Sequence, residues 1–167
     1  MDSSLLYSAC TNGQVHVWDL ETLGCSHTFF DRGHPVINDL LVVDGMSQVA
    51  GACLDGKIYM IDLHLHRVTK TLSGHKTAAS MLKYSSENGY LISAGLDHYI
   101  QVWNPHVEQK IGTLAGHRSQ LVGMEVVPSS PQVITADETG VVKIWDLRKF
   151  AAVQTIAKEL TTAFHGL

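Results

Sequence analysis

Residues whose side chains could perform hydrolytic chemistry lie close together in the middle of the chain, as His75, Ser93 and Asp97. A serine activated by a histidine, which an aspartate orients, is the arrangement of many hydrolases. That chemistry also needs a sharp turn at the serine and donors for an oxyanion, and the sequence around Ser93 supplies neither signal. We therefore predict that the three residues are structural and that the chain is not an enzyme.

A second chemical candidate is the pair His64 and His66, which an extended backbone would place on one side. Two imidazoles can contribute to a zinc site. No Cys or further His follows at ligand spacing, so two solvated loop histidines are the favoured interpretation. We expect no metal and no cofactor. A metal-binding or hydrolytic protein that uses these histidines is the alternative hypothesis.

The elements that must position these residues recur at a fixed interval. Four strand-like runs end on a Trp or Ile followed by Asp or Asn, at steps of 43, 42 and 42 residues. These motifs lie at residues 18–19, 61–62, 103–104 and 145–146. Gly-His pairs recur in the same phase, at residues 33–34, 74–75 and 116–117. A period of about 40 residues indicates a repeat architecture.

Between these motifs, short apolar runs bounded by Gly, Asn, Asp or Ser have the pattern of β-strands. They predict strands at residues 5–10, 14–20, 26–30, 36–43, 48–53, 57–63, 68–72, 79–84, 90–95, 99–103, 109–114, 121–127, 132–136, 141–147 and 152–156. Turns at 11–13, 54–56 and 138–140 contain residues that tolerate a positive φ. The first repeat therefore has three strands and lacks an inner one. A further strand over residues 160–164 could close a ring.

The pattern predicts a single array over residues 1–167, without a linker or a second domain. Repeat one covers about residues 1–32, repeat two 33–73, repeat three 74–115 and repeat four 116–157, followed by a tail at 158–167.

These repeats resemble the WD40 family of β-propellers. The resemblance implies an all-β fold of about four repeats, each a blade of four antiparallel strands, as a partial propeller or as half of a larger ring. It also implies a hydrogen-bonded tetrad in the third repeat, formed by His75, Ser93, Asp97 and Trp103.

The tetrad is expected to be incomplete elsewhere. The fourth repeat supplies His117, Thr135 and Trp145, but Thr139 stands at the Asp position when counted from the Trp. The second repeat has Gly51 and Ile61 at the hydroxyl and indole positions. The fourth network should therefore be shortened, and the second should be apolar.

The resemblance further implies a non-catalytic scaffold for protein–protein interactions and the assembly of a multiprotein complex. Family members often contact partners through residues near the Gly-His pair and just before the tetrad Asp. The matching positions are Val36, Asn38, Leu54, Ala78, Ser80, Leu96, Gln120, Val122 and Glu138. Exposed Leu54, Leu96 and Val122 would form an apolar patch for a peptide. Lys76 and Arg118 would add a positive edge for an acidic partner.

Composition narrows the classes of partner. The net charge is −4, the pI is about 6.2, and no run of Lys or Arg exceeds two residues, which argues against nucleic acid and anionic membranes. The three cysteines fall in strand-like runs and predict reduced core thiols. We expect a protein or peptide partner, with two alternatives for the array: a homodimer that completes an eight-bladed ring, or the remainder of a longer propeller.

The cellular location of the protein is predicted from the lack of membrane-span and secretion signals and from the resemblance of one segment. No apolar stretch approaches a membrane span and no basic start precedes an apolar run, so a cytoplasmic protein is expected. Residues 130–156 faintly resemble large WD-repeat proteins of cilia and flagella, which adds a cilium or flagellum as a location. The same likeness leaves open a structural segment of a larger multi-domain protein.

Overall fold

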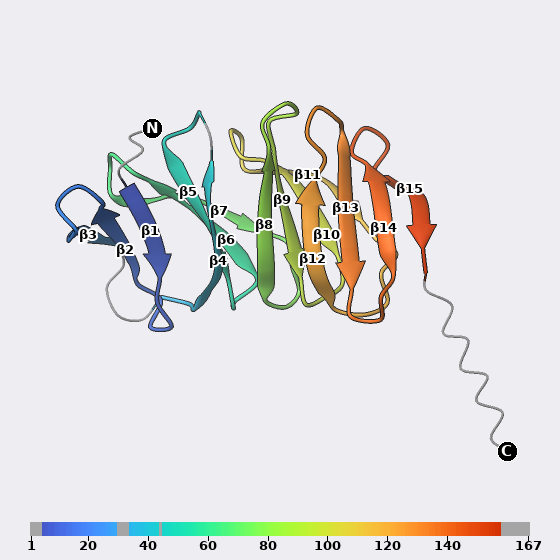
Figure 1. Cartoon of the computed structure of the whole chain (residues 1–167), viewed down its shortest axis with the longest axis horizontal. Helices are drawn as coiled ribbons and strands as arrows, with labels where there is room; N and C mark the ends of the chain where they lie inside the picture. Colours follow the sequence, from blue (N-terminus) through green and yellow to red (C-terminus); the bar gives the residue numbers. More distant parts are fainter. Residues whose placement is uncertain (1–4, 30–33, 44, 158–167) are drawn as a thin grey trace, which may run out of the picture.

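Fifteen β-strands build the protein in the computed structural model, which describes residues 5–29, 34–43 and 45–157 (Figure 1). The first sheet contains β1 (Leu5–Ala9), β2 (Val15–Asp19) and β3 (Gly24–Phe29). The second contains β4 (Ile37–Val43), β5 (Gln48–Cys53), β6 (Lys57–Asp62) and β7 (Arg67–Ser73). The third contains β8 (Ala79–Ser85), β9 (Tyr90–Gly95), β10 (Ile100–Asn104) and β11 (Gln109–Leu114). The fourth contains β12 (Leu121–Val126), β13 (Gln132–Asp137), β14 (Val142–Asp146) and β15 (Ala151–Ile156).

Each sheet is an antiparallel meander in which the strand order follows the chain order. The four sheets follow one another along the long axis of the molecule, from the N-terminal side to the C-terminal side (Figure 1). Their inner strands are neighbours, since β4 contacts β8 and β8 contacts β12. The prediction of an all-β fold with three-, four-, four- and four-stranded repeats is confirmed.

Local chemistry explains the strand boundaries. Each predicted strand is present, with ends that differ by no more than two residues, while the predicted end at Phe30 and the strand over 160–164 lie outside the described residues. The turns after the second strands carry glycines at φ between 80° and 84°, namely Gly13, Gly56 and Gly140. A glycine has no Cβ to clash in this left-handed region, so these tight turns form without strain.

The core lies between the sheets rather than within one of them. Val15 and Phe29 of the first sheet pack with Ile61 of the second. Ile58 packs against the third sheet in the cluster that contains Trp103, and the next cluster along the chain contains Trp145. Sheets cover one another because each buries side chains on both faces of its central strands, and this burial is the main stabilising term.

A β-bulge recurs beside the repeat motif. In each sheet the pairing of the third strand with the outer strand shifts by one residue immediately before Trp18, Ile61, Trp103 or Trp145. A bulge bends the strand and changes the direction of the neighbouring side chain. The Trp or Ile of each repeat motif therefore lies beside a β-bulge in its pairing with the outer strand.

The cysteine prediction is only partly correct. Cys53 is buried at the end of β5 and Cys10 is half-buried, but Cys25 is exposed. Cys25 lies on β3, an outer strand on which four consecutive residues face solvent. Among the described residues there is no helix with the length and hydrophobicity to span a membrane.

Candidate functional site

The predicted tetrad of the third sheet is a continuous hydrogen-bonded chain. Trp103 Nε1 donates to Ser93 Oγ at 2.9 Å, Ser93 Oγ lies 2.8 Å from His75 Nε2, and His75 Nδ1 lies 3.0 Å from Asp97 Oδ1. An indole only donates and a carboxylate only accepts, so the direction of the chain is fixed. The Ser93 hydroxyl donates to Nε2, and Nδ1–H of a neutral imidazole donates to Asp97.

Backbone groups hold the acidic end of this chain. The backbone N–H groups of Lys76 and Tyr99 donate to Asp97 at 2.9 and 3.3 Å. Burial raises the pKa of Asp97, but these donors and the contact with His75 outweigh it and hold the pKa below its usual value. Burial lowers the pKa of His75, against the opposing pull of Asp97, which agrees with the neutral imidazole. The network joins the Gly-His connector to strands β9 and β10.

The fourth sheet contains a complete network, which corrects the prediction that it is shortened. Trp145 Nε1 donates to Thr135 Oγ1 at 2.8 Å, and His117 Nε2 lies 2.7 Å from the same hydroxyl. The carboxylate comes from Asp137, whose Oδ2 lies 2.7 Å from His117 Nδ1. Thr139, predicted to replace the acid, donates to Asp137 through its hydroxyl and its backbone N–H. The network is therefore whole, with the acid two residues earlier than counted.

A glycine explains why the acid can move. Gly95 occupies in the third sheet the place that Asp137 has in the fourth, 42 residues later. A Cβ added to Gly95 would meet His75 Nδ1 at 2.4 Å and Asp97 Oδ1 at 2.5 Å. The space beside the imidazole is thus filled by Asp97 from the turn in one sheet and by Asp137 from the strand end in the other.

The first two sheets keep parts of the network. Trp18 Nε1 donates to Ser8 Oγ at 2.8 Å in the first sheet, and the indole is only half-buried. In the second sheet the hydroxyl and indole positions are apolar as predicted, and Ile61 is buried. Asp55 instead accepts from the hydroxyl of Tyr59 at 2.9 Å.

The geometry of His75, Ser93 and Asp97 resembles a catalytic triad, but its exposure does not. Ser93 is fully buried, and its oxygen already accepts the Trp103 N–H. A nucleophile must reach its substrate, and this oxygen cannot. The serine therefore closes a structural chain.

The loop histidines His64 and His66 lie beside a cavity between the first two sheets. His66 stacks on His27 with 3.9 Å between ring centroids, and His64 donates its backbone N–H to Asp62. His27, His64 and His66 border a cavity of about 360 Å³ between the first and second sheets. In the part of the chain that the structure describes, no three His, Cys, Asp or Glu side chains are grouped to hold a metal ion.

Comparisons with known proteins agree with this architecture. The family model described as WD domain, G-beta repeat, matches residues 66–104 and 108–146. A solved chain in the crystal structure of the mitotic checkpoint complex superposes with a TM-score of 0.83 over 93% of this chain and 48% of that one, at 23% identity. The two matched repeats and the superposed fold support a WD40 family for this chain. Its four sheets are propeller blades, here called blades one to four in chain order.

Curated relatives extend the comparison. Cilia- and flagella-associated protein 337 B of Tetrahymena thermophila is 29% identical over 164 residues, which is 98% of this chain and 13% of that protein. The probable coatomer subunit beta' of Schizosaccharomyces pombe is 25% identical over 142 residues, which is 84% of this chain and 18% of that protein. The first similarity confirms the predicted likeness to a protein of cilia and flagella. The chain spans less than a fifth of either relative.

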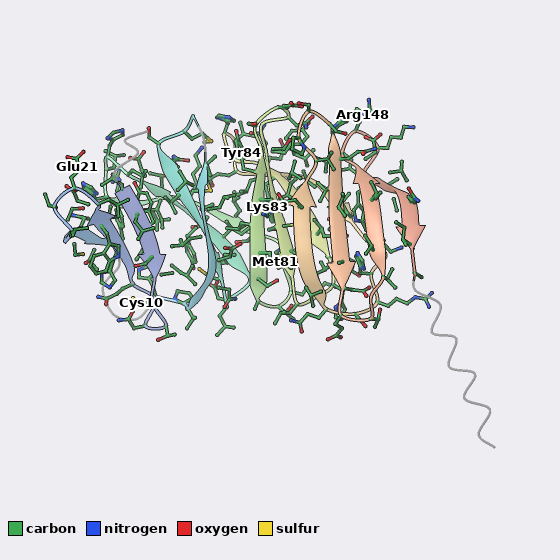
Figure 2. The ribbon with its side chains drawn as sticks, viewed as in Figure 1. Cys10, Glu21, Met81, Lys83, Tyr84 and Arg148 are labelled. Atoms are coloured by element: carbon green, nitrogen blue, oxygen red, sulfur yellow. The ribbon has the colours of Figure 1, made fainter. Side chains whose placement is uncertain are left out.

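The predicted contact residues lie on one rim of the blades. The strands of a complete blade are lettered A to D from the inner strand to the outer one. The edge at which β1, β5, β9 and β13 end carries the turns between strands B and C, and we call it the B–C rim. Cys10, directly after β1, lies at this lower edge, whereas Arg148, after β14, lies at the opposite edge (Figure 2). The opposite edge, at which β2, β6, β10 and β14 end, is called the C–D rim.

Hydrogen bonds bring the predicted contact residues together in pairs. Leu54 N–H donates to the Val36 carbonyl at 2.8 Å, and Leu96 N–H donates to the Ala78 carbonyl at 2.9 Å. Glu138 N–H donates to the Gln120 carbonyl at 3.0 Å in blade four. Each turn after a second strand is thus fixed to the connector before the inner strand of its own blade.

The predicted residues differ in what they offer to a partner. Leu54 is 57% exposed, Leu96 38% and Val122 60%, and the side chains of Lys76, Arg118, Gln120 and Glu138 also face solvent. Ala78 is buried, and the Ser80 hydroxyl donates to the Ala94 carbonyl of its own blade. Asn38 donates through Nδ2 to the Ala79 carbonyl, and so it joins blades two and three.

Two sets of inter-blade contacts carried no sequence signal. Asp39 accepts the backbone N–H of Leu82 at 2.7 Å. Lys70 donates to the carbonyls of Pro105 and His106 at 2.8 and 2.7 Å. Such contacts join residues about 35 to 43 positions apart, and only the three-dimensional stacking of blades reveals them.

Proposed function

We propose that this protein is a non-catalytic scaffold that binds a protein or peptide partner on its B–C rim, within a multiprotein assembly. The single observation that carries the proposal is the pair Leu54 and Leu96, two exposed leucines at equivalent turns of adjacent blades. Leaving two leucines in water at a rigid turn is costly, and covering them with a partner removes that cost.

The surroundings of the leucines favour a mixed apolar and acidic partner. The side chains of Lys76 and Arg118 are exposed in the Gly-His connectors that precede the inner strands of blades three and four. Each follows the histidine of its blade by one residue. A partner segment with an apolar residue for the leucines and an acidic one for Lys76 fits this surface. No cofactor or metal takes part in the proposed binding.

The array as a whole is proposed to be one unit, residues 1–167, in the cytoplasm. The similarity to a cilia- and flagella-associated protein supports a ciliary or flagellar assembly as the setting. Because the chain spans 13% of that relative, we also propose that the four blades act together with further blades, from a longer propeller or from a second copy.

The test compares the two rims of the same two blades. Leu54→Ser with Leu96→Ser changes the B–C rim, and Leu65→Ser with Val107→Ser changes the C–D rim, where both side chains are also exposed at turns between third and outer strands. Tagged chains of residues 1–167 are cross-linked in ciliated cells, and the bound proteins are quantified by mass spectrometry.

We expect the B–C variant to lose a set of cross-linked proteins that the C–D variant keeps. Circular dichroism and urea unfolding must first show that both variants remain folded. Loss of the same proteins in the C–D variant alone would assign binding to the opposite rim. Retention of all of them in both variants would contradict the proposal.

A further inference from the structure

A cavity between blades one and two plays no part in the proposed rim contact. It measures about 360 Å³ and lies where the first two sheets meet, with β1 in contact with β4 (Figure 1). Val17 and Phe29 of blade one are buried in its wall, and Val42 and Leu63 of blade two line it from the other side. Mostly apolar cavities of about 300–1,000 Å³ with a few polar groups are typical of small-molecule sites. The cavity therefore has the size and the lining of a ligand site.

The junction of blades two and three shows what occupies the equivalent space. Tyr84 of β8 is the counterpart of Val42, 42 residues later, and Met60 is the counterpart of Val17, 43 residues later. Met60 belongs to the core cluster of this junction together with Leu72, and Tyr84 packs against that cluster. An aromatic ring and a longer side chain thus occupy the space that two valines leave between blades one and two.

The junction of blades three and four contains an aromatic ring as well. Phe150 lies in the turn between β14 and β15, at the position that His66 has in blade two, and the two residues have φ of 49° and 52°. It packs against the core cluster that contains Val102, the counterpart of Val17. A Cβ added to Gly112, on the outer strand of blade three, would meet Phe150 Cδ1 at 2.6 Å. Both other junctions are therefore filled by an aromatic side chain of the protein itself.

Blades one and two meet through imidazoles at these positions instead. His27 is the counterpart of Gly112, and His66 stacks on it with 3.9 Å between the ring centroids. Phe29 lies edge-on to His27, with 5.3 Å between the centroids. His27, His64 and His66 border the cavity, and within the described part of the chain no group forms a hydrogen bond with their ring nitrogens. Polar atoms that can donate are thus available beside an apolar cavity.

The charge of the lining indicates the polar group of a ligand. None of the described residues that line the cavity is Asp, Glu, Lys or Arg. A carboxylate would therefore meet no acidic side chain there, and imidazoles donate hydrogen bonds in both their neutral and their protonated forms. A cation would lose hydration without gaining an acidic partner. A negatively charged acceptor is the head group that this lining favours.

We propose that the cavity binds a small aromatic carboxylate. The ring lies between the sheets, in the space that Tyr84 and Phe150 fill at the other junctions. The carboxylate accepts hydrogen bonds from His27 and His66. The site lies beside the turn between β6 and β7, at the C–D rim, and is separate from the rim proposed for protein partners.

The first experiment measures the binding of naphthoate to the chain of residues 1–167 by calorimetry, and histidine ring-proton NMR reports where it binds. We expect the resonances of His27 and His66 to shift, while that of His106, an exposed histidine of blade three, does not. Naphthamide has the rings without the charge, and octanoate has the charge without the rings. Each should bind about ten-fold more weakly than naphthoate. Absence of naphthoate binding at about 1 mM would overturn the proposal.

Filling the cavity separates a specific site from adsorption to the surface. Val42→Tyr introduces the residue that blade three has at the equivalent position, and it should weaken naphthoate binding about ten-fold or more because the space is taken. Val107→Tyr, at an exposed turn of blade three, is the matched control and should bind as the wild type does. If Val42→Tyr does not fold, Val17→Met takes its place, following Met60. A folded, cavity-filled variant with wild-type affinity would overturn the proposal.

The head group is tested by His27→Phe together with His66→Phe. This variant keeps two stacked rings but has no ring nitrogens there, so naphthoate should bind about ten-fold more weakly and no better than naphthamide. An undiminished preference for the carboxylate would contradict the assignment of its hydrogen bonds to the two histidines. Tighter binding of the peptide Gly-Gly-Trp than of naphthoate would assign the cavity to a peptide terminus and overturn the small-molecule assignment. Leu54→Ser with Leu96→Ser should leave naphthoate binding unchanged, so this proposal and that of the B–C rim can fail independently.

Discussion

Blades three and four build the same polar network from different sequence positions. In blade three the carboxylate of Asp97 reaches back from the turn into space left by Gly95, whereas in blade four Asp137 supplies it from the strand end. In both, the indole, hydroxyl, imidazole and carboxylate satisfy one another, so none of these four side chains leaves its linking polar atom buried without a partner. The two blades therefore keep a carboxylate oxygen at the same place in space, beside the histidine Nδ1, although the aspartate stands at different positions of the repeat.

The strongest way to break the comparison is to remove the hydroxyl in the middle of each network. Thr135→Val keeps the shape of the side chain but leaves Trp145 N–H and His117 Nε2 buried without partners. Ser93→Ala does the same in blade three. Unpaired buried groups cost about 1–3 kcal/mol each, so we expect each variant to lose about 3 kcal/mol of unfolding free energy.

The control for this prediction is Ser8→Ala, because Trp18 is half-buried and can turn its N–H to water. Its expected cost is about 1 kcal/mol. Urea unfolding followed by tryptophan fluorescence measures all three. Equal losses in blades one, three and four would show that the buried network adds nothing to a single hydrogen bond.

Exchanging the acid between positions tests the comparison directly. Gly95→Asp in blade three places a second carboxylate where Asp97 already lies, which adds overpacking and like-charge repulsion; the cost should be about 2–3 kcal/mol. Adding Asp97→Thr recreates the blade-four arrangement and should recover most of the loss. The coupling is read from a double-mutant cycle in urea.

Two outcomes of the exchange are informative beyond the rescue. Gly95→Ala should also destabilise, since even a Cβ approaches His75 within 2.4 Å. Purely additive losses for Gly95→Asp and Asp97→Thr would mean that the two blades do not share one design, and that Asp137 depends on other parts of blade four.

Sequence reasoning predicted the period, the sheets and the blade-three network, but it missed Asp137. Counting back from the Trp fixes positions along the backbone, and it selects Thr139. The count cannot register that a strand-end side chain reaches the same space as a turn side chain. The signal that could have found it was Gly95, which aligns with Asp137 when the third and fourth repeats are superposed. A glycine in one repeat at the position of an aspartate in the next leaves room for a carboxylate from another residue.

The burial of the rim and of the blade faces was harder to predict, because it depends on contacts between repeats. Ala78 and Val122 have similar apolar character, yet one is buried and the other is 60% exposed. Likewise, Ile92 and Ile144 look alike in the sequence. Their difference arises because blade four covers one face and the described residues leave the other open.

Lowering the pH should weaken the network of blade four by a smaller amount than the substitutions above. Burial raises the pKa of Asp137, but donors from Thr139, His117 and Val141 outweigh it and leave the pKa at about 2, against 3.8 ordinarily. A carboxyl whose folded pKa is lowered stabilises the fold above its unfolded pKa, and this contribution is lost as pH falls from about 4 toward 2. We therefore expect the urea midpoint to fall across this window.

Asp137→Asn should make that fall shallower, although it lowers stability at pH 7. The slope should not vanish, because Asp146, paired with Arg148, also has a pKa of about 2. His75 acts at higher pH: its folded pKa is lowered by burial, so stability should begin to decline as pH drops below about 6.5. A variant with the same acid slope as the wild type would contradict the role of Asp137.

The smallest expected effect concerns the turn that follows the network. Blades two and four have Gly56 and Gly140 there at φ of 80° and 84°, but blade three has His98 at φ 65° with its Nδ1 buried and without a hydrogen-bond partner in the described residues. His98→Gly should raise the unfolding free energy by about 1 kcal/mol, because it removes left-handed strain.

The reciprocal change separates strain from packing in the same turn. Nothing lies within 4 Å of a Cβ added at Gly140, so Gly140→Ala should cost about 1 kcal/mol through backbone conformation alone. Both variants are measured by thermal and urea unfolding against the wild type. If His98→Gly destabilised the chain while Gly140→Ala did so as expected, the imidazole of His98 would be a packing element of blade three, and the two blades would differ at their turns as well as in their acids.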